Sequence, residues 1–251
     1  MRQPFLFAIE SFMCSPSHTS IPNDERSCLC YNTVMKTEDI PDFLSDMKAA
    51  YWDASCALDF ETPYELLVAT VLSAQCTDER VNKVTSVLFR RASTPEQMLG
   101  LTIDELEDII RPCGLYKTKA AHIMSLSRTL VEDYGSRVPE TRAELKKLPG
   151  VGEKTASVVL SNAFGVPAIA VDTHVFRVSG RLGLSHEKTP DKTAQVLMKT
   201  FPEEDWSLIH HMLIKHGREI CRARNPECSA CPVRKYCEYY EKTEESRPAL
   251  T

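Results

Sequence analysis

The sequence predicts an all-α protein. Apolar residues recur at intervals of three and four along several stretches, whereas no stretch alternates between apolar and polar residues as a half-buried strand would. Proline and glycine residues separate these stretches and mark short connections, and no internal repeat is present. Helices are expected over residues 64–72, 81–88, 103–110, 121–130, 142–148 and 156–163.

Length and composition describe an ordinary globular chain. Its 251 residues suffice for one large domain or two modest ones, and 43% of them are hydrophobic while 26% are charged. No apolar run approaches the roughly 20 residues of a membrane span, and the N-terminal segment lacks the pattern of a signal peptide. We therefore expect a cytoplasmic protein. Residues 1–34 show no helical period and are expected to form a loose tail of unknown role, or to precede a translation start at Met35.

The formal net charge of −5 hides two basic stretches. Residues 111–128 contain four basic residues and no acidic one, and residues 209–237 contain six basic residues and two acidic ones. Lys and Arg side chains that contact phosphates release counterions, so they add affinity for nucleic acid whatever the net charge. The two stretches therefore fit a DNA-binding surface. By themselves they fit a solvated basic face equally well.

Four of the ten cysteines lie within one 17-residue segment, separated by six, two and five residues. In a cytoplasmic protein this spacing indicates metal ligands, and four thiolates suit either a zinc ion or an iron–sulfur cluster. A zinc ribbon usually has two separated Cys-x-x-Cys pairs, whereas this segment has one. Single cysteines such as Cys113 are expected to be small buried hydrophobes. The four candidate ligands are Cys221, Cys228, Cys231 and Cys237.

Residues 148–156, Leu-Pro-Gly-Val-Gly-Glu-Lys-Thr-Ala, have the pattern of a helix-hairpin-helix. Pro149 would end the preceding helix, and Gly150 and Gly152 are expected to adopt backbone angles that other residues resist. The free N–H groups at the start of the following helix would suit a DNA phosphate. A plain tight turn between two helices is the simpler alternative.

Lys154 falls in the first turn of the second helix of this motif. The positive end of a helix and partial burial both favour the neutral amine, which is the nucleophilic form. A contact between an exposed ammonium and a phosphate is the alternative role. Asp172 follows eighteen residues later, before an apolar-periodic stretch, so it is expected to cap a helix. The same carboxylate could accept a proton from the Lys154 amine and stabilise positive charge on a sugar.

The hairpin string, the string Val-Asp-Thr-His-Val-Phe-Arg-Val at residues 171–178 and the cysteine spacing resemble the endonuclease III family of DNA glycosylases. A basic helix end, His-Gly-Arg at residues 216–218, completes the resemblance, which runs from about residue 60 to residue 240. It implies a two-lobed helix-hairpin-helix glycosylase fold with DNA across the cleft between the lobes. Residues 57–166 would form a six-helix barrel lobe, and residues 35–56 with 167–245 would form a lobe that holds a [4Fe-4S] cluster.

The same resemblance implies a reaction. Lys154 and Asp172 would be the catalytic pair of a bifunctional DNA N-glycosylase and AP lyase of base excision repair. The Lys154 amine would attack C1′ of an oxidised pyrimidine nucleotide, release the base and form an imine, and β-elimination would then nick the strand. The four cysteines would hold the cluster. The expected partner is damaged double-stranded DNA, bound by a monomer in the cytoplasm of a bacterium, at the nucleoid.

A base in a duplex must be extruded before it can be removed. The resemblance assigns Gln75 and Leu115 to filling the gap, whereas a helix cap is the alternative for Gln75 and core packing is the alternative for Leu115. Lys119, with Lys117, is expected to hold the DNA strand beside Leu115. Further DNA contacts are expected from Gly150, Gly152, Thr155 and His174.

Other functions share part of this pattern. An adenine-mismatch glycosylase has the same fold and cluster, but it lacks the hairpin lysine and has a recognition domain after the cluster, whereas 14 residues follow Cys237 here. A noncatalytic iron–sulfur protein that binds DNA or transfers electrons needs neither Lys154 nor Asp172, and the same holds for a zinc-binding structural protein. The presence of both residues therefore favours the bifunctional enzyme.

Overall fold

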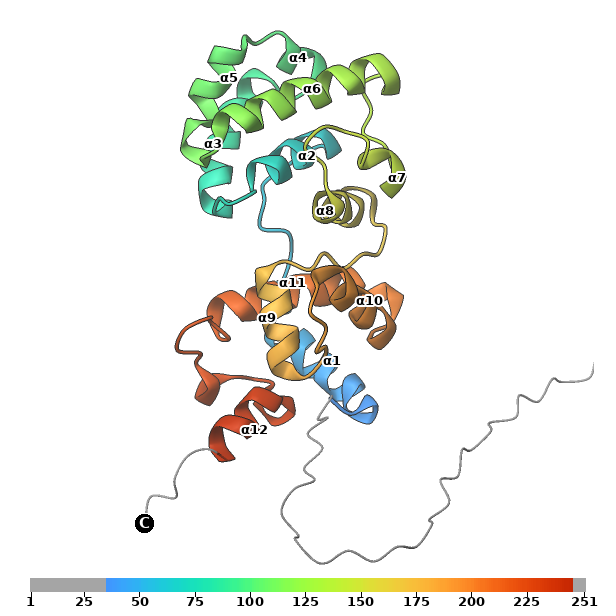
Figure 1. The fold of residues 1–251 in the computed structure, drawn as a ribbon, viewed down its shortest axis with the longest axis vertical. Coiled ribbons are helices and arrows are strands. Elements are labelled where there is room, and N and C mark those ends of the chain that lie inside the picture. The colour runs from blue at the N-terminus through green and yellow to red at the C-terminus, as the bar shows by residue number, and fades with distance from the viewer. Residues whose placement is uncertain (1–34, 246–251) are drawn as a thin grey trace, which may run out of the picture. The chain divides into compact units, whose positions relative to one another are not determined.

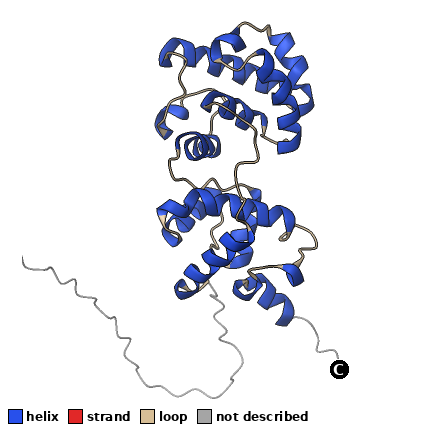
Figure 2. Ribbon diagram, turned by 180° about the vertical axis from the view of Figure 1, so that it is seen from behind, coloured by secondary structure: helices blue, strands red, loops and turns tan. Residues whose placement is uncertain are grey.

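The computed structural model describes residues 35–245, so the expectations for residues 1–34 lie outside the described residues. The described part contains helices and no strand (Figure 2), which confirms the all-α prediction. None of its helices is long and apolar enough to cross a membrane. The α-helices are α1 (Ile40–Ala50), α2 (Pro63–Leu72), α3 (Asp78–Arg91), α4 (Pro95–Leu99), α5 (Ile103–Ile110), α6 (Tyr116–Tyr134), α7 (Arg142–Leu145), α8 (Glu153–Phe164), α9 (Thr173–Leu182), α10 (Pro190–Thr200), α11 (Trp206–Glu219) and α12 (Glu238–Glu245). Short 3₁₀-helices are η1 (Thr37–Asp39), η2 (Arg111–Cys113), η3 (Glu203–Asp205), η4 (Cys228–Ala230) and η5 (Arg234–Tyr236).

Helices α2 to α8 contribute to one hydrophobic core (Figure 1). Within it, α2 is enclosed on all sides, because every residue from Tyr64 to Leu72 is buried. A helix that is apolar all round is stable only when other helices cover all of its faces. Thr62 begins α2 by accepting a hydrogen bond from the Glu65 N–H, and Pro63 occupies the first turn, where no N–H is needed.

A second hydrophobic core brings α1 together with α9, α10, α11 and α12 (Figure 1). The N-terminal helix therefore packs with the C-terminal helices, although α2 to α8 lie between them in sequence. Phe43 of α1 is fully buried and contacts the rings of Phe201 and Tyr236. The boundaries expected for the two lobes stay a prediction.

Contacts between α8 and α11 join the two cores. Ser161 Oγ donates a hydrogen bond to Ser207 Oγ at 2.7 Å, and His211 Nε2 lies 2.9 Å from Asn162 Oδ1. Both pairs are at least partly buried, so they compete little with water. The C-terminal part of α8 is thereby fastened to α11.

The six predicted ranges correspond to α2, α3 and α5 to α8 and differ from them mainly at the ends, whereas α1, α4 and α9 to α12 have no counterpart among those ranges. The range 103–110 is reproduced by α5. Helix α6 is longer than its predicted range 121–130 and ends at Tyr134, before the C-cap residue Gly135, whose φ of 55° is left-handed. Helix α7 is shorter than the predicted range 142–148, because the Leu148 N–H bonds to the Leu145 carbonyl in a tighter turn that leads into the hairpin.

Candidate active site

The two glycines of the hairpin between α7 and α8 have different roles. Gly150 has a φ of +79°, and a Cβ added to it would lie 2.9 Å from the Cβ and Nδ1 atoms of His122. Any other residue there would combine a left-handed backbone with a collision. Gly152 has a φ of −95° and open space around it. The prediction that Gly152 needs an unusual backbone angle is therefore wrong.

The first turn of α8 presents N–H groups that no capping side chain covers, because Gly152 is its N-cap residue. Thr155 lies in this turn and is half-buried. Glu153 forms ion pairs with Arg142 and, at 2.9 Å, with Lys146. Hydrogen bonds from Lys146 and then Arg142 hold the pKa of Glu153 below its ordinary value. Sequence reasoning missed this clamp across the hairpin.

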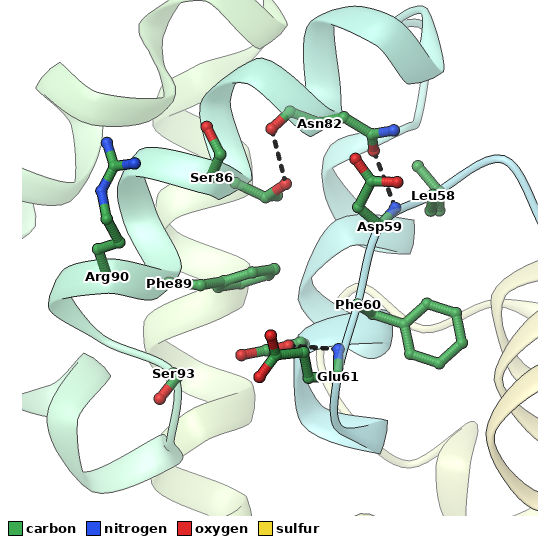
Figure 3. Close-up of a pocket in the computed structure, with 11 residues that line it drawn as sticks. Leu58, Asp59, Phe60, Glu61, Asn82, Ser86, Phe89, Arg90 and Ser93 are labelled. Atoms are coloured by element: carbon green, nitrogen blue, oxygen red, sulfur yellow. Dashed lines mark hydrogen bonds between the residues drawn. The ribbon is translucent and has the colours of Figure 1, made fainter.

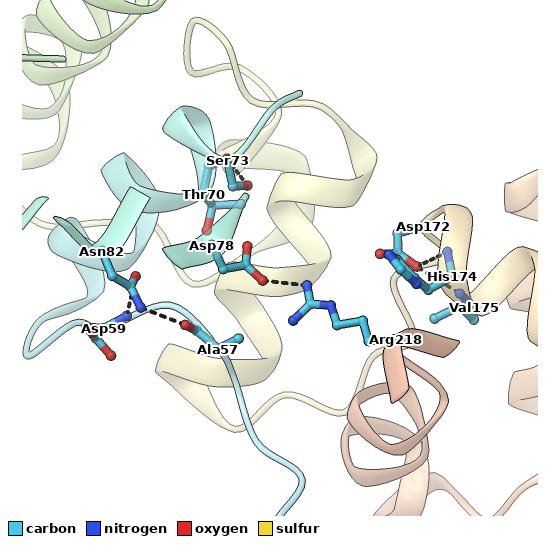
Figure 4. A network of polar contacts seen from close by, with 10 residues as sticks. All are labelled: Ala57, Asp59, Thr70, Ser73, Asp78, Asn82, Asp172, His174, Val175 and Arg218. Atoms are coloured by element: carbon cyan, nitrogen blue, oxygen red, sulfur yellow. Dashed lines mark hydrogen bonds and ion pairs between the residues drawn. The ribbon is translucent and has the colours of Figure 1, made fainter. Parts of the chain in front are cut away.

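Lys154 and Asp172 line the same pocket, which has a volume of about 340 Å³. Small-molecule sites in proteins span about 300–1,000 Å³, so the pocket is of a size that holds a ligand. Both cores contribute to it, through Thr70 of α2 and through Arg218 of α11, which forms an ion pair with Asp78 at the start of α3 (Figure 4). Lys154 itself is exposed, so the expectation of partial burial is wrong.

Asp172 caps α9, as predicted. Its Oδ1 accepts hydrogen bonds from the N–H groups of His174 and Val175, both at 2.8 Å (Figure 4). Because Oδ1 accepts both bonds, Oδ2 takes no part in the cap. His174 is half-buried, its Nδ1 lies 3.3 Å from Nη2 of Arg177, and burial lowers its pKa. The expected contact of His174 with DNA stays a prediction.

A buried histidine lines the pocket beside Lys154. His210 of α11 is 3% exposed, and within the described residues its Nδ1 has no hydrogen-bond partner. Burial, followed by the charges of His211 and Lys154, lowers the pKa of His210 to about 3. The ring is therefore neutral at physiological pH and adds no positive charge next to the amine. Sequence reasoning missed His210, because a histidine in an apolar-periodic helix gives no signal that separates a pocket residue from a core residue.

Gln75 and Leu115 are both exposed and both have left-handed backbone, with φ angles of 54° and 47°. This conformation costs about 1–2 kcal/mol in residues with a side chain, and strain of this kind clusters at functional sites. Leu115 is 60% exposed, so the core-packing alternative is wrong. The C-cap residue of α2 is Ser73, whose Oγ donates to the Thr70 carbonyl at 2.8 Å, so Gln75 is not the cap.

Lys119 is not placed to contact a DNA strand. Lys119 is only 4% exposed, and its Nζ donates hydrogen bonds to the carbonyl oxygens of Leu72 and Cys113, both at 2.8 Å. Burial lowers the pKa of Lys119. The expected phosphate contact is therefore wrong for this residue, because the ammonium faces the protein interior. Lys117, in the same first turns of α6, is exposed.

The four cysteines lie in the segment between α11 and α12, and the structure pairs none of them in a disulfide. Arg181 of α9 holds this loop by donating to the Arg222 carbonyl at 2.7 Å and to Sγ of Cys221 at 3.5 Å. Arg177, one turn earlier on α9, donates to the carbonyls of Gly217 and Cys221 at 2.9 and 3.1 Å. Sequence reasoning missed both arginines, although their four-residue spacing places them on one helix face.

His216 does not contribute to a basic helix end. The residue is 1% exposed, and burial lowers its pKa to about 4. Its Nδ1 lies 2.6 Å from the Tyr51 hydroxyl, and its Nε2 lies 3.9 Å from Sγ of Cys231. The neutral ring therefore connects α1 to the cysteine loop, and Arg218 is the charged residue of the predicted His-Gly-Arg segment.

Comparison with known proteins identifies the family. Residues 68–203 match the HhH-GPD superfamily of base excision DNA repair proteins, and residues 221–237 match the iron–sulfur binding domain of endonuclease III. Endonuclease III of Bacillus subtilis strain 168 is 52% identical over 75% of this chain and 87% of its own length. The chain belongs to the endonuclease III family. Endonuclease III of Escherichia coli strain K12 is 47% identical over 74% of this chain and 89% of its own length.

Solved structures agree with membership of the endonuclease III family. A trapped covalent intermediate of endonuclease III with DNA is 47% identical, with a TM-score of 0.79 over 83% of this chain and 99% of that chain. A thermostable thymine-DNA glycosylase is 28% identical, with a TM-score of 0.74 over 82% and 98%. As a member of the endonuclease III family, the chain is a DNA glycosylase and lyase of base excision repair. The predicted fold and class of enzyme are confirmed.

The cysteine loop is the iron–sulfur domain of this endonuclease III relative, and the predicted [4Fe-4S] cofactor is confirmed. The four thiols lie near enough to one another to interact electrostatically. Burial raises the pKa of Cys231 to about 11, and Cys237, Cys221 and Cys228 lie near enough for their charges to raise it too. A cationic iron centre would remove this mutual repulsion between thiolates.

A larger pocket, of about 680 Å³, lies between α3 and the segment that precedes α2 (Figure 3). Asn82 of α3 ties that segment down, because it accepts from the Asp59 N–H at 3.1 Å and donates to the Ala57 carbonyl at 2.9 Å. Neither Lys154 nor Asp172 lines this pocket. The pocket lies where Asn82 fixes the segment that connects α1 to α2.

Proposed function

We propose that the chain excises oxidised pyrimidines from double-stranded DNA and then cleaves the strand, with Lys154 as nucleophile. The observation that carries the proposal is that Lys154 and Asp172 line one pocket, at the starts of α8 and α9. A related endonuclease III has been trapped as a covalent intermediate with DNA. The exposed amine of Lys154 is available for a bond of the same kind.

The first step forms the bond between enzyme and sugar. The Lys154 amine must lose a proton, since only the neutral nitrogen carries a lone pair. Oδ2 of Asp172, which takes no part in the helix cap, would accept that proton directly or through water. The lone pair then forms the N–C1′ bond while the glycosidic bond breaks, and the bonding electrons leave with the base. Where Lys154 is already neutral, Asp172 keeps its charge, and the carboxylate would instead stabilise the positive charge that develops on the sugar.

The second step cleaves the strand. Opening of the sugar ring gives an imine between Lys154 and C1′, and loss of a proton from C2′ then expels the 3′ phosphate. A charged imidazole beside Lys154 would repel the positive imine, and the buried His210 stays neutral. Cys221, Cys228, Cys231 and Cys237 would hold the [4Fe-4S] cluster, which would crosslink the loop between α11 and α12.

We propose that the duplex lies across two lobes, residues 57–166 and residues 35–56 with 167–245. Two separate hydrophobic cores and a pocket lined from both of them support this division. Uncovered N–H groups at the start of α8 support a phosphate contact at the hairpin, and strained exposed residues support insertion into the duplex. The proposed DNA contacts are Gln75, Leu115, Gly150, Gly152, Thr155 and His174.

The remaining proposals concern the oligomeric state and the cellular location of the protein. We propose that the protein acts as a monomer, because Lys154 and Asp172 come from one chain and line one pocket. We propose that it acts on the chromosome in the cytoplasm of a bacterium, and the bacterial relatives support this assignment.

The test is borohydride trapping on a duplex oligonucleotide that carries thymine glycol. Borohydride reduces an imine to a stable amine, so the intact protein should form a covalent adduct with DNA. Lys154→Ala should form none, while Lys147→Ala, which removes an exposed lysine near the hairpin, should form the adduct at the wild-type rate. No adduct with the intact protein, or an adduct that persists in Lys154→Ala, would contradict the mechanism.

A further inference from the structure

The loops that carry Gln75 and Leu115 meet at the ammonium of Lys119. Helix α2 ends at Leu72, three residues before Gln75, and η2 ends at Cys113, two residues before Leu115. Nζ of Lys119 donates to the carbonyl oxygens of both terminal residues at 2.8 Å. One side chain of α6 thus connects the starting points of the two exposed loops.

Both carbonyls need a partner. The last carbonyl oxygens of a helix receive no hydrogen bond from an N–H group of the same helix. A cation placed there also interacts favourably with the helix dipole. Because Lys119 is 4% exposed, water does not replace the ammonium as the donor. Three N–H groups on one nitrogen can serve two carbonyls at once, so the distance between the two loop origins depends on this side chain.

The strained backbone conformations of the two loop residues must also be held by surrounding contacts. Gln75 and Leu115 have φ angles of 54° and 47°, and each residue carries a side chain. Such backbone strain persists only where the surrounding structure over-determines it. The hydrogen bonds of Lys119 act on both loops, each within three residues of the strained position.

We propose that Lys119 is a positioning residue for base extrusion, which holds the loops of Gln75 and Leu115 at a set separation so that both side chains enter the duplex together. The inference rests on the proposed function, since it takes these two residues to fill the gap left by the extruded base. Lys119 makes no contact with DNA in this role. It acts through the two carbonyls of Leu72 and Cys113.

The experiment compares two substrates. One is thymine glycol paired with adenine in a full duplex, and the other is the same lesion in an unpaired bulge, where no stacked pair has to be opened. Lys119→Met keeps the length of the side chain and removes the ammonium. We expect its single-turnover rate on the paired lesion to fall by about 10- to 100-fold, because a misplacement of about 1 Å can cost 10²-fold. Its rate on the bulged lesion should stay near that of the wild type.

Lys117→Met is the matched variant, because Lys117 is an exposed lysine on the same helix. A lysine that contacts phosphate should, when removed, lower affinity for both substrates and reduce the slope of log affinity against log salt by about one. Lys119→Met should leave that slope unchanged. A reduced slope in Lys119→Met would overturn the proposal in favour of a direct phosphate contact.

A second arm separates positioning from general stability. In a Gln75→Ala, Leu115→Ala background the two side chains that enter the duplex are absent. Lys119→Met should therefore lower the rate on the paired substrate no further. If it slows that background by the same factor, or slows both substrates equally in the wild-type background, Lys119 is a structural residue and the inference fails. Should the Met variant fail to fold, Lys119→Gln, which keeps an amide donor, replaces it in both measurements. If the wild-type protein cleaves neither substrate, the proposed function fails instead.

Discussion

Gly150→Ala should destabilise the protein, because this one methyl group meets two separate obstacles. The backbone at Gly150 has a φ of +79°, a region that residues with a Cβ rarely adopt. The added Cβ would also lie 2.9 Å from Cβ of His122. The obstructing atom belongs to the stem of that side chain, so a change of rotamer does not relieve the contact.

The expected loss of stability follows from these two contributions. A left-handed backbone costs about 1–2 kcal/mol in a residue other than glycine. Overpacking by a methyl group costs typically about 1–3 kcal/mol. The lower entropy of the unfolded alanine chain offsets about 0.4–1 kcal/mol. The free energy of unfolding should therefore fall by roughly 1–5 kcal/mol, which corresponds to a decrease in Tm of roughly 2–20 °C in a chain of this size.

Gly152→Ala is the matched control, measured by urea and thermal denaturation under the same conditions. Gly152 has a φ of −95° and no atom within 4 Å of an added Cβ. Its stability should change by less than about 0.5 kcal/mol. Its affinity for DNA should nevertheless fall, because the methyl group would stand where a phosphate approaches the N–H groups of α8. A Gly150→Ala variant as stable as the wild type would refute the reasoning, and so would equal destabilisation by both substitutions.

Two further predictions concern Asp172 and His210. Asp172→Asn keeps the helix cap, since Asn and Asp cap equally well, so the free energy of unfolding should change by less than about 0.5 kcal/mol. Its single-turnover rate should fall by about 10²- to 10⁴-fold, whereas an unchanged rate would reduce Asp172 to a cap. His210 takes up a proton near pH 3 in the folded chain and near its ordinary pKa of 6.5 in the unfolded chain. The unfolded state therefore binds more protons between these values, and stability is lost as the pH falls from about 6.5 towards 3, by on the order of 5 kcal/mol. Denaturation curves over a pH series should show a flatter decline for His210→Leu, and a decline as steep as that of the wild type would contradict this account.

The features that the sequence predicts well are those encoded by neighbouring residues. The cap by Asp172 was predictable because a carboxylate followed by an apolar period has a local reason to accept N–H bonds. The left-handed angle at Gly150 was predictable for the same kind of reason, from a glycine between two helices. The same rule failed at Gly152, since that glycine keeps space free and its backbone angle suits any residue.

The features that the sequence does not predict depend on contacts between distant segments. Lys119 and Lys117 are both lysines at the start of one helix, yet one is buried and the other exposed. The difference arises because two carbonyls from separate helices converge on Nζ of Lys119. His216 likewise follows a basic pattern in sequence, and burial against Tyr51 makes it neutral. Burial of a polar side chain is decided by tertiary structure, so residue type and spacing alone leave it open.

The residues with proposed roles in the reaction lie mostly at helix ends, and this explains why structural and chemical roles coincide in them. Lys154 lies in the first turn of α8, Asp172 is the N-cap of α9 and Leu115 is the N-cap of α6. A helix end exposes backbone groups that need partners, so a polar residue there has a structural role whatever its chemistry. For Asp172 the amide variant separates the two roles, because it keeps the cap and removes the charge. For Lys119 the choice of substrate separates the two roles. A bulged lesion needs no insertion of Gln75 and Leu115, while the protein itself is unchanged.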